Sequence, residues 1–472
     1  MHKKLILVFS VLFFTFLISI SQVKAIHISC GSTLTSNTTL DSDLNCPNTG
    51  IFIGANDVVL DCQGFVINHS QTTAGSGINI TGFNSATIKD CNIFQANSSV
   101  LSFMDGIHLS NSFNNKVLNN NISHVPFQNS LRGISLRSSH NNTFINNNLT
   151  ISMFSNGILL SSSSHNNFIG TSMVGITNIL SGGSNHNNIS FGAFSNLQII
   201  AGFNDSGVFT GSNNNYISHN RGTDARGPRN PAIRLFRSDG NIISNNNLST
   251  AGAFAPGIRV DGNNNIIQGN VINMSRGMGI ELGSVTAVNH NRVINNKISA
   301  IGIGILLDHF SQNNTLLGND VETTGDHSTS IFFQRFSSNN TLKNNVLKGK
   351  NSYMEMSENL FNNTMENTTF LDEGGSIRFP EKIDILPGFA LFSKRIISKS
   401  NLNISLNPTF PINTIFLNSN DENVSFLNRS AELTMFESFI NPKPIVDIND
   451  NGTFVDCDNT TTPRCDIVSV TP

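Results

Sequence analysis

The sequence predicts an all-β protein folded as a right-handed parallel β-helix. An asparagine-rich phrase recurs about a dozen times along the chain, which indicates a solenoid. A second phrase of glycine and aliphatic residues lies between its copies, and no helical period competes with this alternation. The clearest copies of the first phrase are residues 141–149, 263–272 and 313–321. Each contains an apolar residue followed three positions later by Asn.

The apolar residues of the first phrase, here called anchors, lie about 21 to 29 residues apart, which is the length of one coil. We take the anchors to be Val59, Ile88, Val117, Phe144, Phe168, Ile189, Tyr216, Ile243, Ile267, Val293, Leu316, Leu342 and Met365. The second phrase, as in residues 106–109 and 304–307, gives each coil at least two short strands. Clusters of Gly and Asn are expected to supply the positive φ angles of the corners.

Such coils must stack, because one coil cannot bury its own apolar face. At a strand spacing of about 4.8 Å, a dozen coils make a rod roughly 60 Å long. Identical residues then lie above one another, so the asparagines three residues after the anchors are expected to form a hydrogen-bonded ladder. The predicted ladder consists of Asn120, Asn147, Asn246, Asn270, Asn296, Asn319 and Asn345. Uncharged side chains suit such a stack, and only 12% of the residues are charged.

Charge and the N-terminal sequence bear on location. The net charge is −3, from 28 basic and 31 acidic residues, so we expect no nucleic-acid partner. Residues 1–25 are typical of a secretory signal, with a charged start, an apolar run from Leu5 to Ile20 and a small-residue cleavage site at Ala25. The alternative is a retained membrane anchor. Both interpretations place the protein at the cell surface or in the medium, with membrane contact only through export or an anchor.

Six cysteines agree with export. Two of them lie three residues after an anchor on successive coils, at a separation that a disulfide accepts. Stacked free thiols are the alternative for this pair. The expected disulfides are Cys62 with Cys91, Cys30 with Cys46 and Cys457 with Cys465. About twenty Asn-x-Ser/Thr sequons are also present, and we expect a minority to carry glycans.

The repeats divide the mature chain into three parts. Residues 26–50 are expected to cap the first coil, and residues 51–375 to form the parallel β-helix. Residues 376–472 are expected to form a small antiparallel, sandwich-like β domain. The sequence stops within an expected strand, so we expect this domain to be incomplete or completed by another chain.

One segment of the last domain has the oxygen-ligand spacing of a Ca²⁺ loop. Its candidate ligands are Asp447, Asn449, Asn451 and Asp458. The flanking sequences favour strands around an Asn-Gly turn, so a plain hairpin is the alternative. Calcium is the one cofactor that the sequence suggests.

A group of arginines breaks the low-charge pattern of the coils. The candidate ligand-binding residues are Arg226, Arg229, Arg234, Arg237 and Arg259. Arg234 and Arg259 share the third place of the glycine-aliphatic phrase with Glu281, so three charges are expected on successive coils. Arginines there can bind the carboxylate of a uronic acid. The alternative is an ordinary surface ladder in which Glu281 offsets Arg259.

The acidic residues do not predict a catalytic site. Polysaccharide cleavage needs two or three carboxylates that converge, or a base beside a bound cation. Asp261 and Asp308 are each expected to stand alone. No catalytic residue is therefore assigned.

Histidines mark one corner of several coils. His140, His165 and His186 each precede an Asn-Asn pair, and His290 occupies a similar place, so stacked imidazoles are expected. Such a stripe suits copper or zinc, but ligands from one wall do not surround a metal ion. A polar ladder is the alternative.

The repeated Asn-Asn-x-Ile-x-x-Asn-x-Ile phrase, with Gly-Ile-x-Leu between its copies, resembles the β-helix repeats of NosD-like and carbohydrate-binding surface families. The resemblance covers about residues 50–375. The pattern of Cys30, Cys46, residues 59–64 and residues 87–91 is similar to that of exported β-helix proteins of archaeal cell surfaces, which carry caps of this kind. Related folds include pectate lyases and polygalacturonases, whose catalytic motifs have no matching positions here. NosD is associated with copper-site maturation.

We therefore expect an exported or cell-surface β-helix protein with a structural or adhesive role and no recognisable catalytic site. Its expected partners are extracellular polysaccharides or other surface proteins. A polysaccharide lyase or glycoside hydrolase acting at the coils around residues 221–239 is the first alternative. A NosD-like metal-handling protein is the second.

Overall fold

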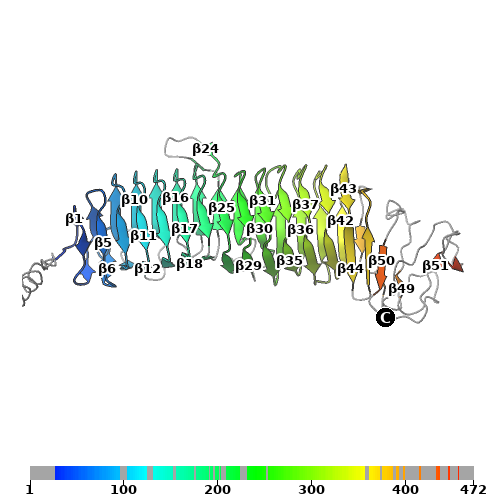
Figure 1. Cartoon of the computed structure of the whole chain (residues 1–472), viewed down its shortest axis with the longest axis horizontal. Coiled ribbons are helices and arrows are strands. Elements are labelled where there is room, and N and C mark those ends of the chain that lie inside the picture. Colours follow the sequence, from blue (N-terminus) through cyan, green and yellow to red (C-terminus); the bar gives the residue numbers. More distant parts are fainter. Residues whose placement is uncertain are drawn as a thin grey trace, which may run out of the picture.

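The computed structural model is a long rod of stacked coils (Figure 1). It describes residues 27–95, 104–124, 131–151, 156–174, 177–190, 192–194, 197–200, 202–203, 209–223, 231–250, 254–356, 361–372, 375–385, 390–392, 397–398, 414–415, 432–435, 445–446 and 455–456. Every regular element in these ranges is a strand. The described residues contain no helix that is long and apolar enough to cross a membrane. The predicted all-β, parallel β-helix fold is confirmed.

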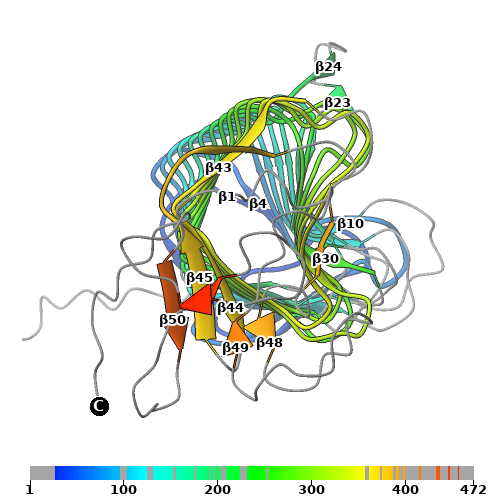
Figure 2. The same cartoon turned by 90° about the vertical axis from the view of Figure 1, so that its right-hand side faces the viewer.

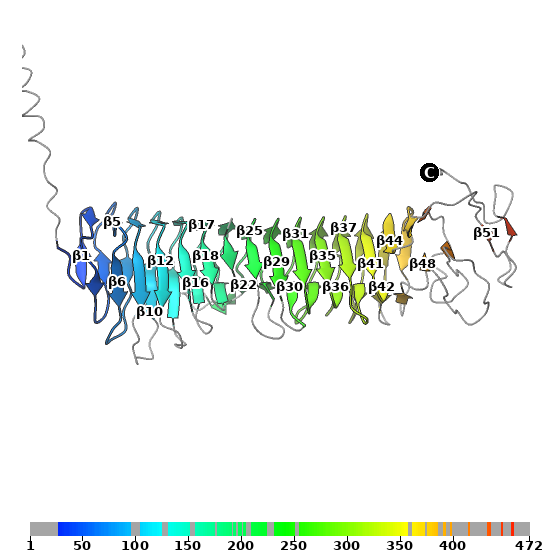
Figure 3. The ribbon, with the colours of Figure 1, turned by 90° about the horizontal axis from the view of Figure 1, so that it is seen from below.

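Three long parallel sheets form the walls, and each coil contributes one strand to each sheet (Figure 2). The strands lie across the long axis of the rod (Figure 3). The first and second sheets have 15 strands each, and the last strand of each is antiparallel, so 14 parallel strands stack in each wall. The described residues thus form about as many coils as the dozen or so expected from the sequence.

The first sheet contains β1 (Ser32–Leu34), β4 (Ile51–Ile53), β7 (Ile78–Thr81), β10 (Met104–Ser110), β13 (Leu131–Arg137), β16 (Asn156–Ser161), β19 (Thr177–Ser181), β22 (Leu197–Ile200), β27 (Ile233–Phe236), β30 (Pro256–Asp261), β33 (Met278–Leu282), β36 (Ile303–Leu307), β39 (Thr329–Phe333), β42 (Ser352–Met356) and β47 (Ala390–Phe392). The second contains β2 (Thr38–Thr39), β5 (Val59–Asp61), β8 (Thr87–Lys89), β11 (Lys116–Leu118), β14 (Thr143–Ile145), β17 (Asn167–Ile169), β20 (Asn188–Ser190), β25 (Tyr216–Ser218), β28 (Ile242–Ser244), β31 (Ile266–Gln268), β34 (Arg292–Ile294), β37 (Thr315–Leu317), β40 (Thr341–Lys343), β43 (Asn363–Glu366) and β46 (Ile383–Ile385).

The third sheet contains β3 (Leu44–Asn45), β6 (Val66–His69), β9 (Asn92–Gln95), β12 (Asn121–His124), β15 (Asn148–Thr150), β18 (Ser172–Val174), β21 (Ala193–Phe194), β26 (Arg221–Thr223), β29 (Asn247–Thr250), β32 (Val271–Met274), β35 (Lys297–Ala300), β38 (Asp320–Thr323), β41 (Val346–Gly349), β44 (Thr368–Asp372), β45 (Gly375–Phe379) and β50 (Glu432–Met435). Three short antiparallel pairs complete the described strands, namely β23 (Gly202–Phe203) with β24 (Phe209–Thr210), β48 (Ile397–Ser398) with β49 (Thr414–Ile415), and β51 (Ile445–Val446) with β52 (Val455–Asp456).

The anchors line the core in register. Val117, Phe144 and Phe168 pair in succession in the second sheet, and the two phenyl rings stack with centroids 4.4 Å apart. Two predicted anchors are wrong by one residue. Leu60, not Val59, pairs with Ile88, and Ile217, not Tyr216, pairs with Ile189 and Ile243. Adjacent apolar residues at both places leave the sequence alternation ambiguous, and the structure resolves it by burying Leu60 and Ile217.

The predicted asparagine ladder is present at the end of the second-sheet strands, and we call it the Asn120 ladder. Asn270 shows its bonding: its backbone N and its Nδ2 donate to Asn296 Oδ1 at 3.0 and 2.9 Å. Each of the seven predicted residues takes part. Asn220 joins the ladder through Asn246, and the sequence misses it because the neighbouring anchor was misplaced. Thr171 and Gly192 interrupt the ladder.

A second ladder, which sequence reasoning did not find, runs without interruption at the start of the second-sheet strands. We call it the Asn115 ladder, and each Nδ2 donates to the Oδ1 of the next member at 3.0–3.2 Å. Its members are Asn115, Asn142, Asn166, Asn187, Asn215, Asn241, Asn265, Asn291, Asn314, Asn340 and Asn363, all buried. The two ladders satisfy buried corner groups that no strand partner reaches.

The two residues of each Asn-Asn pair have different structural roles. The first, such as Asn264 with φ of 56°, takes the left-handed turn and is exposed, while the second, Asn265, lies in the ladder. Asn tolerates this conformation better than most residues. The glycines of the Gly-Ile-x-Leu phrase do not have the expected positive φ. They allow adjacent coils to approach closely, because a Cβ on Gly279 would lie 2.4 Å from the carbonyl oxygen of Gly304 on the next coil.

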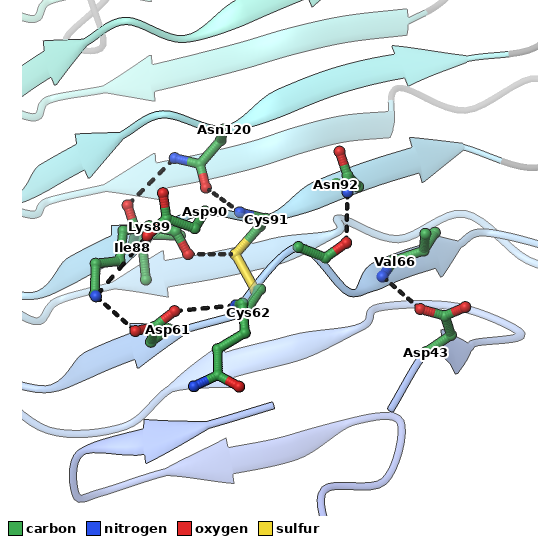
Figure 4. Close-up of a disulfide and its surroundings, with 12 residues drawn as sticks. Asp43, Asp61, Cys62, Val66, Ile88, Lys89, Asp90, Cys91, Asn92 and Asn120 are labelled. Carbon is green, nitrogen blue, oxygen red and sulfur yellow. Dashed lines mark hydrogen bonds and ion pairs between the residues drawn. A yellow bond between two sulfur atoms is a disulfide. The ribbon is translucent and has the colours of Figure 1, made fainter. Parts of the chain in front are cut away.

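The N-terminal residues predicted as a cap, 26–50, contribute β1, β2 and β3 and so form the first coil themselves. The disulfides Cys30–Cys46 and Cys62–Cys91 are confirmed, with Cα separations of 5.3 and 4.8 Å. The second one joins adjacent coils (Figure 4). Asn120 Oδ1 accepts from the Cys91 backbone N at 3.0 Å, so the disulfide continues the Asn120 ladder.

At the other end, antiparallel strands close all three walls. β47 pairs with β42, β46 with β43, and β45 with both β44 and β50. An open parallel edge would pair with other chains, and this arrangement covers it. The described strands of the predicted C-terminal domain that join the main sheets therefore continue the rod. Cys457 and Cys465 lie outside the described residues.

Candidate functional site

The predicted charged row lies on the first sheet. Arg234 of β27 pairs in register with Arg259 of β30, which pairs with Glu281 of β33, so the three charges lie on successive coils as the sequence predicts. Their neighbours along each strand are buried aliphatic residues. The side chains of the row therefore point out of the rod. Arg226 and Arg229 lie outside the described residues.

The pair formed by Arg259 and Glu281 is mostly buried. Arg259 Nε donates to Glu281 Oε2 at 2.7 Å, and the two side chains are 14% and 7% exposed. The expected offset of one charge by the other is thus present. Removing one partner from such a pair leaves the other charge buried and unpaired.

A phenylalanine lies between two arginines next to this pair. The Cζ atoms of Arg234 and Arg237 lie 5.0 and 5.3 Å from the centroid of the Phe236 ring. Both distances are within the range of cation–π attraction. Burial lowers the pKa of Arg234, which is half-buried. Phe236 was not singled out from the sequence, although its position between Arg234 and Arg237 is visible there.

Asp261 does not stand alone, contrary to the sequence expectation. It follows Arg259 by two residues on β30 and is almost fully buried. Its Oδ1 accepts a hydrogen bond from the backbone N of Val285 at 2.8 Å, while its buried Oδ2 has no hydrogen-bond partner. Burial raises the pKa of Asp261, opposed by that hydrogen bond and by Arg259 and Arg234. The structure thus places a protonatable carboxyl beside the charged row.

Asp308 does not stand alone either. It is almost fully buried, and its carboxylate lies 3.1 Å from His309 Nδ1 and 3.5 Å from Arg335 Nε. Arg335 Nη1 lies 2.9 Å from His309 Nε2. A neutral imidazole with its proton on Nδ1 satisfies both contacts, because Nε2 then accepts from the guanidinium. Asp308 thereby orients the half-buried His309 and the exposed Arg335 at the turn between the first and second sheets.

The same turn carries two exposed phenylalanines. Phe310 and Phe336 lie on adjacent coils, are 48% and 51% exposed, and stack with ring centroids 5.0 Å apart. Three residues separate Leu307 from Ser311, whereas two separate Leu109 from Ser112, which makes the equivalent hydrogen bond. Each phenylalanine is therefore part of a turn lengthened by one residue. We call Asp308, His309, Phe310, Arg335 and Phe336 the aromatic corner; the changed spacing is the sequence signal for it.

Comparison with known proteins gives one family. Residues 176–376 match the family of periplasmic copper-binding proteins, NosD. The predicted resemblance to NosD-like repeats is confirmed. No curated protein sequence matches the chain.

Solved structures with a similar arrangement include bacteriophage and bacterial proteins. The chain matches a tailspike protein of bacteriophage CBA120 with 12% identity and a TM-score of 0.40, covering 72% of this chain and 54% of the tailspike. It matches a mannuronan C-5 epimerase module of Azotobacter vinelandii with 14% identity and a TM-score of 0.38, covering 68% and 88%. It matches the catalytic domain of an α-1,3-glucanase with 13% identity and a TM-score of 0.44, covering 74% and 70%. These values bear on neither the substrate nor the activity of this chain.

The NosD match raises the question of copper, which the described histidines do not fit. The rings of His165 and His186 stack with centroids 4.9 Å apart, but His140 stacks on Phe113 instead and accepts from the Ser164 backbone N. The expectation that His140 joins the stripe is wrong, because it lies two residues before the Asn115 ladder and the others lie one before it. Within the described ranges, no three His, Cys, Asp or Glu side chains converge to hold a metal ion.

The predicted calcium ligands cannot be compared with the structure. Asp447, Asn449, Asn451 and Asp458 lie outside the described residues. The neighbouring β51 and β52 form an antiparallel pair around this segment. Calcium in this segment stays a prediction.

A second polar cluster, which the sequence did not reveal, lies on the first sheet near the N-terminus. Asp105 is 4% exposed and accepts from Arg132 Nε at 2.6 Å, and His108 Nδ1 lies 2.9 Å from its other oxygen. His69 is buried nearby, and burial lowers its pKa to about 4, with Asp105 opposing the shift. The cluster fixes the extended ends of β10 and β13 to each other.

Proposed function

We propose that this chain is an exported β-helix protein that binds extracellular polysaccharide through the outer face of the first sheet. Two disulfides in the described coils support export, because such bonds persist in oxidising compartments. The composition of residues 1–25 supports it independently. The role is adhesive or structural, with the rod presenting a fixed surface.

One observation carries the proposal. Arg234 points outward from β27 beside the mostly buried pair of Arg259 and Glu281, and the Phe236 ring lies within cation–π distance of both Arg234 and Arg237. Arginines bind carboxylates and hydroxyls with a fixed geometry, and an aromatic ring packs on the apolar face of a sugar. A rigid wall presents both at the spacing of the coils, so little ordering is needed on binding.

The test is binding of the mature protein to soluble polysaccharides, measured by affinity electrophoresis and calorimetry. The panel contains polygalacturonate, alginate and neutral glucans. Replacing Arg234 and Arg237 by Ala is expected to weaken binding at least about tenfold. Arg292→Ala, which removes an exposed arginine from the second sheet, is the matched control. Equal loss in the control, or no binding to any polysaccharide, would contradict the proposal.

Cleavage of polysaccharide on the same face is the second candidate, and Asp261 is the observation that favours it. Burial raises the pKa of Asp261, which shifts this carboxyl toward the protonated form that a general acid needs. New reducing or unsaturated ends after incubation with the same panel would establish turnover. Asp261→Asn is then expected to remove turnover while binding persists. Turnover that survives this change would place the acid elsewhere.

A further inference from the structure

We infer that the polysaccharide bound by the first sheet is acidic, and that Arg234 selects it by binding a carboxylate or sulfate group. The inference rests on the proposed function and deepens it, because it names the class of polysaccharide and the residue that sets the preference. Carboxylate and sulfate oxygens both accept hydrogen bonds from a guanidinium, so the feature that they share is the negative charge.

The strands around Arg234 contain more arginines than acidic residues. Asp261 and Glu281 are the only acidic residues in the seven first-sheet strands from β13 to β33, which contain four arginines. Glu281 accepts a hydrogen bond from Arg259, and Asp261 accepts one from the Val285 backbone N. Neither carboxyl group therefore forms a hydrogen bond with Arg234.

The guanidinium of Arg234 has no anionic partner among the described residues. Its Nε is buried without a hydrogen-bond partner, and no hydrogen bond or ion pair joins its other nitrogens to the described part of the chain. Arginine does not lose its proton in a protein, so the charge persists although the residue is half-buried. A charge held partly away from water without a counter-ion costs free energy. A bound anionic group would supply this missing partner.

The same guanidinium is restrained before a ligand binds. Its Cζ atom lies 5.0 Å from the centroid of the Phe236 ring, within the range of cation–π attraction. Its strand, β27, pairs in register with β22 on one side and β30 on the other. The side chain therefore loses less conformational freedom on binding than an arginine on a loop would.

Arg259 occupies the equivalent place on the next coil but is not available to a ligand in the same way. Its Nε donates to Glu281 Oε2 at 2.7 Å, and its side chain is only 14% exposed. The charge of Arg259 is thus offset within the protein, whereas that of Arg234 is not. The preference for an acidic ligand should therefore depend on Arg234 more than on its neighbour in the charged row.

The experiment uses two pairs of polymers, each consisting of an acidic and a neutral form. The first pair is polygalacturonate and its fully methyl-esterified form, and the second is dextran sulfate and dextran. We expect the mature wild type to bind at least one acidic polymer about tenfold more tightly than its neutral counterpart, measured by calorimetry. Arg234→Gln is expected to reduce this preference to less than about threefold, because glutamine keeps N–H donors but has no charge.

Two further variants test the role of charge at this position. Arg292→Gln removes an exposed arginine from the second sheet and is the matched control for the loss of one positive charge. It should keep the preference of the wild type. Arg234→Lys keeps the charge without the planar set of donors, so it should keep the preference but bind more weakly. Circular dichroism and urea titration establish that each variant is folded.

The outcomes separate the inference from the proposed function. If wild type binds a neutral polymer as tightly as its acidic counterpart in both pairs, the inference fails while the proposed function stands. A preference that survives Arg234→Gln, or that Arg292→Gln reduces equally, also overturns the inference. If wild type binds no polysaccharide, both fail. A preference confined to one pair supports the inference and identifies the anionic group as a carboxylate or as a sulfate.

Discussion

The turns between the first and second sheets contain both regular and irregular positions. At one end, Asn314 and Asn340 continue a ladder whose members bond alike on eleven coils. Four residues earlier, Phe310 and Phe336 occupy turns that are one residue longer, are exposed and have left-handed backbones. The ladder positions hold the same residue on every coil because stacking requires it there. The turn residues can differ between coils because they do not disturb the ladder. A departure repeated on adjacent coils is therefore not required by the stacking of the coils.

Among the regular positions, we expect the largest loss of stability where the disulfide takes the place of the Asn120 ladder. Replacing Cys62 and Cys91 by Ala removes a cross-link between residues 29 apart, and we expect the free energy of unfolding to fall by about 3 to 4 kcal/mol. Urea titration and hydrogen exchange of the first coils measure the change. Reduced wild type should behave like the variant, and a stable reduced protein would contradict the estimate.

Inside the Asn115 ladder, Asn265→Ala should cost about 3 kcal/mol, because buried donors lose their acceptor. Asn265 Oδ1 accepts from the backbone N and the Nδ2 of Asn241 at 2.8 and 3.1 Å. Asn264→Gly is the control, since Asn264 is exposed and its positive φ suits glycine. Equal stability of the two variants in urea titration would show that the ladder contributes little.

The fold and one ladder could be predicted from the sequence because stacking converts a period into geometry. The Asn115 ladder was missed although its Asn-Asn pairs are plain in the sequence, since nothing local distinguishes a left-handed Asn264 from a buried Asn265. Tyr216 was misplaced for a similar reason, because two apolar residues stand side by side there. The placement of Arg234, Arg259 and Glu281 on successive coils could be predicted, because it depends only on the register of the strands.

The aromatic corner could not be predicted in the same way. It depends on one extra residue in the turns after Leu307 and Phe333. Because the coils vary in length, one extra residue does not stand out in the sequence. Asp261 and Asp308 stand alone in the sequence, yet each meets partners from an adjacent coil. Contacts between coils depend on turn conformation, which the sequence pattern does not specify.

On the irregular side, Phe336→Gly should stabilise the protein by up to about 1 kcal/mol, because glycine takes a positive φ without steric cost. The loss of packing is small, since half of the side chain is in solvent. Urea titration of wild type and variant measures the difference. A loss of stability similar to that of the ladder variant would place Phe336 among the structural positions.

The smallest expected effect concerns Asp261 and depends on pH. Burial raises its pKa in the folded chain above the ordinary value of 3.8, so the folded chain binds more protons than the unfolded chain between the two values. The free energy of unfolding must then fall as the pH rises through the folded pKa. Asp261→Asn keeps an oxygen for the Val285 backbone N and cannot ionise.

The stability of wild type relative to Asp261→Asn should therefore decrease with rising pH, which urea titrations between pH 4 and pH 8 can measure. Asp308→Asn gives the comparison within the corner, because Asp308 has contacts to His309 and Arg335 on both oxygens, whereas Asp261 Oδ2 has no hydrogen-bond partner. A relative stability that rises with pH for Asp261→Asn would mean that Arg234 and Arg259 outweigh burial. Asp261 would then be an ionised member of the charged row and unsuited to donate a proton.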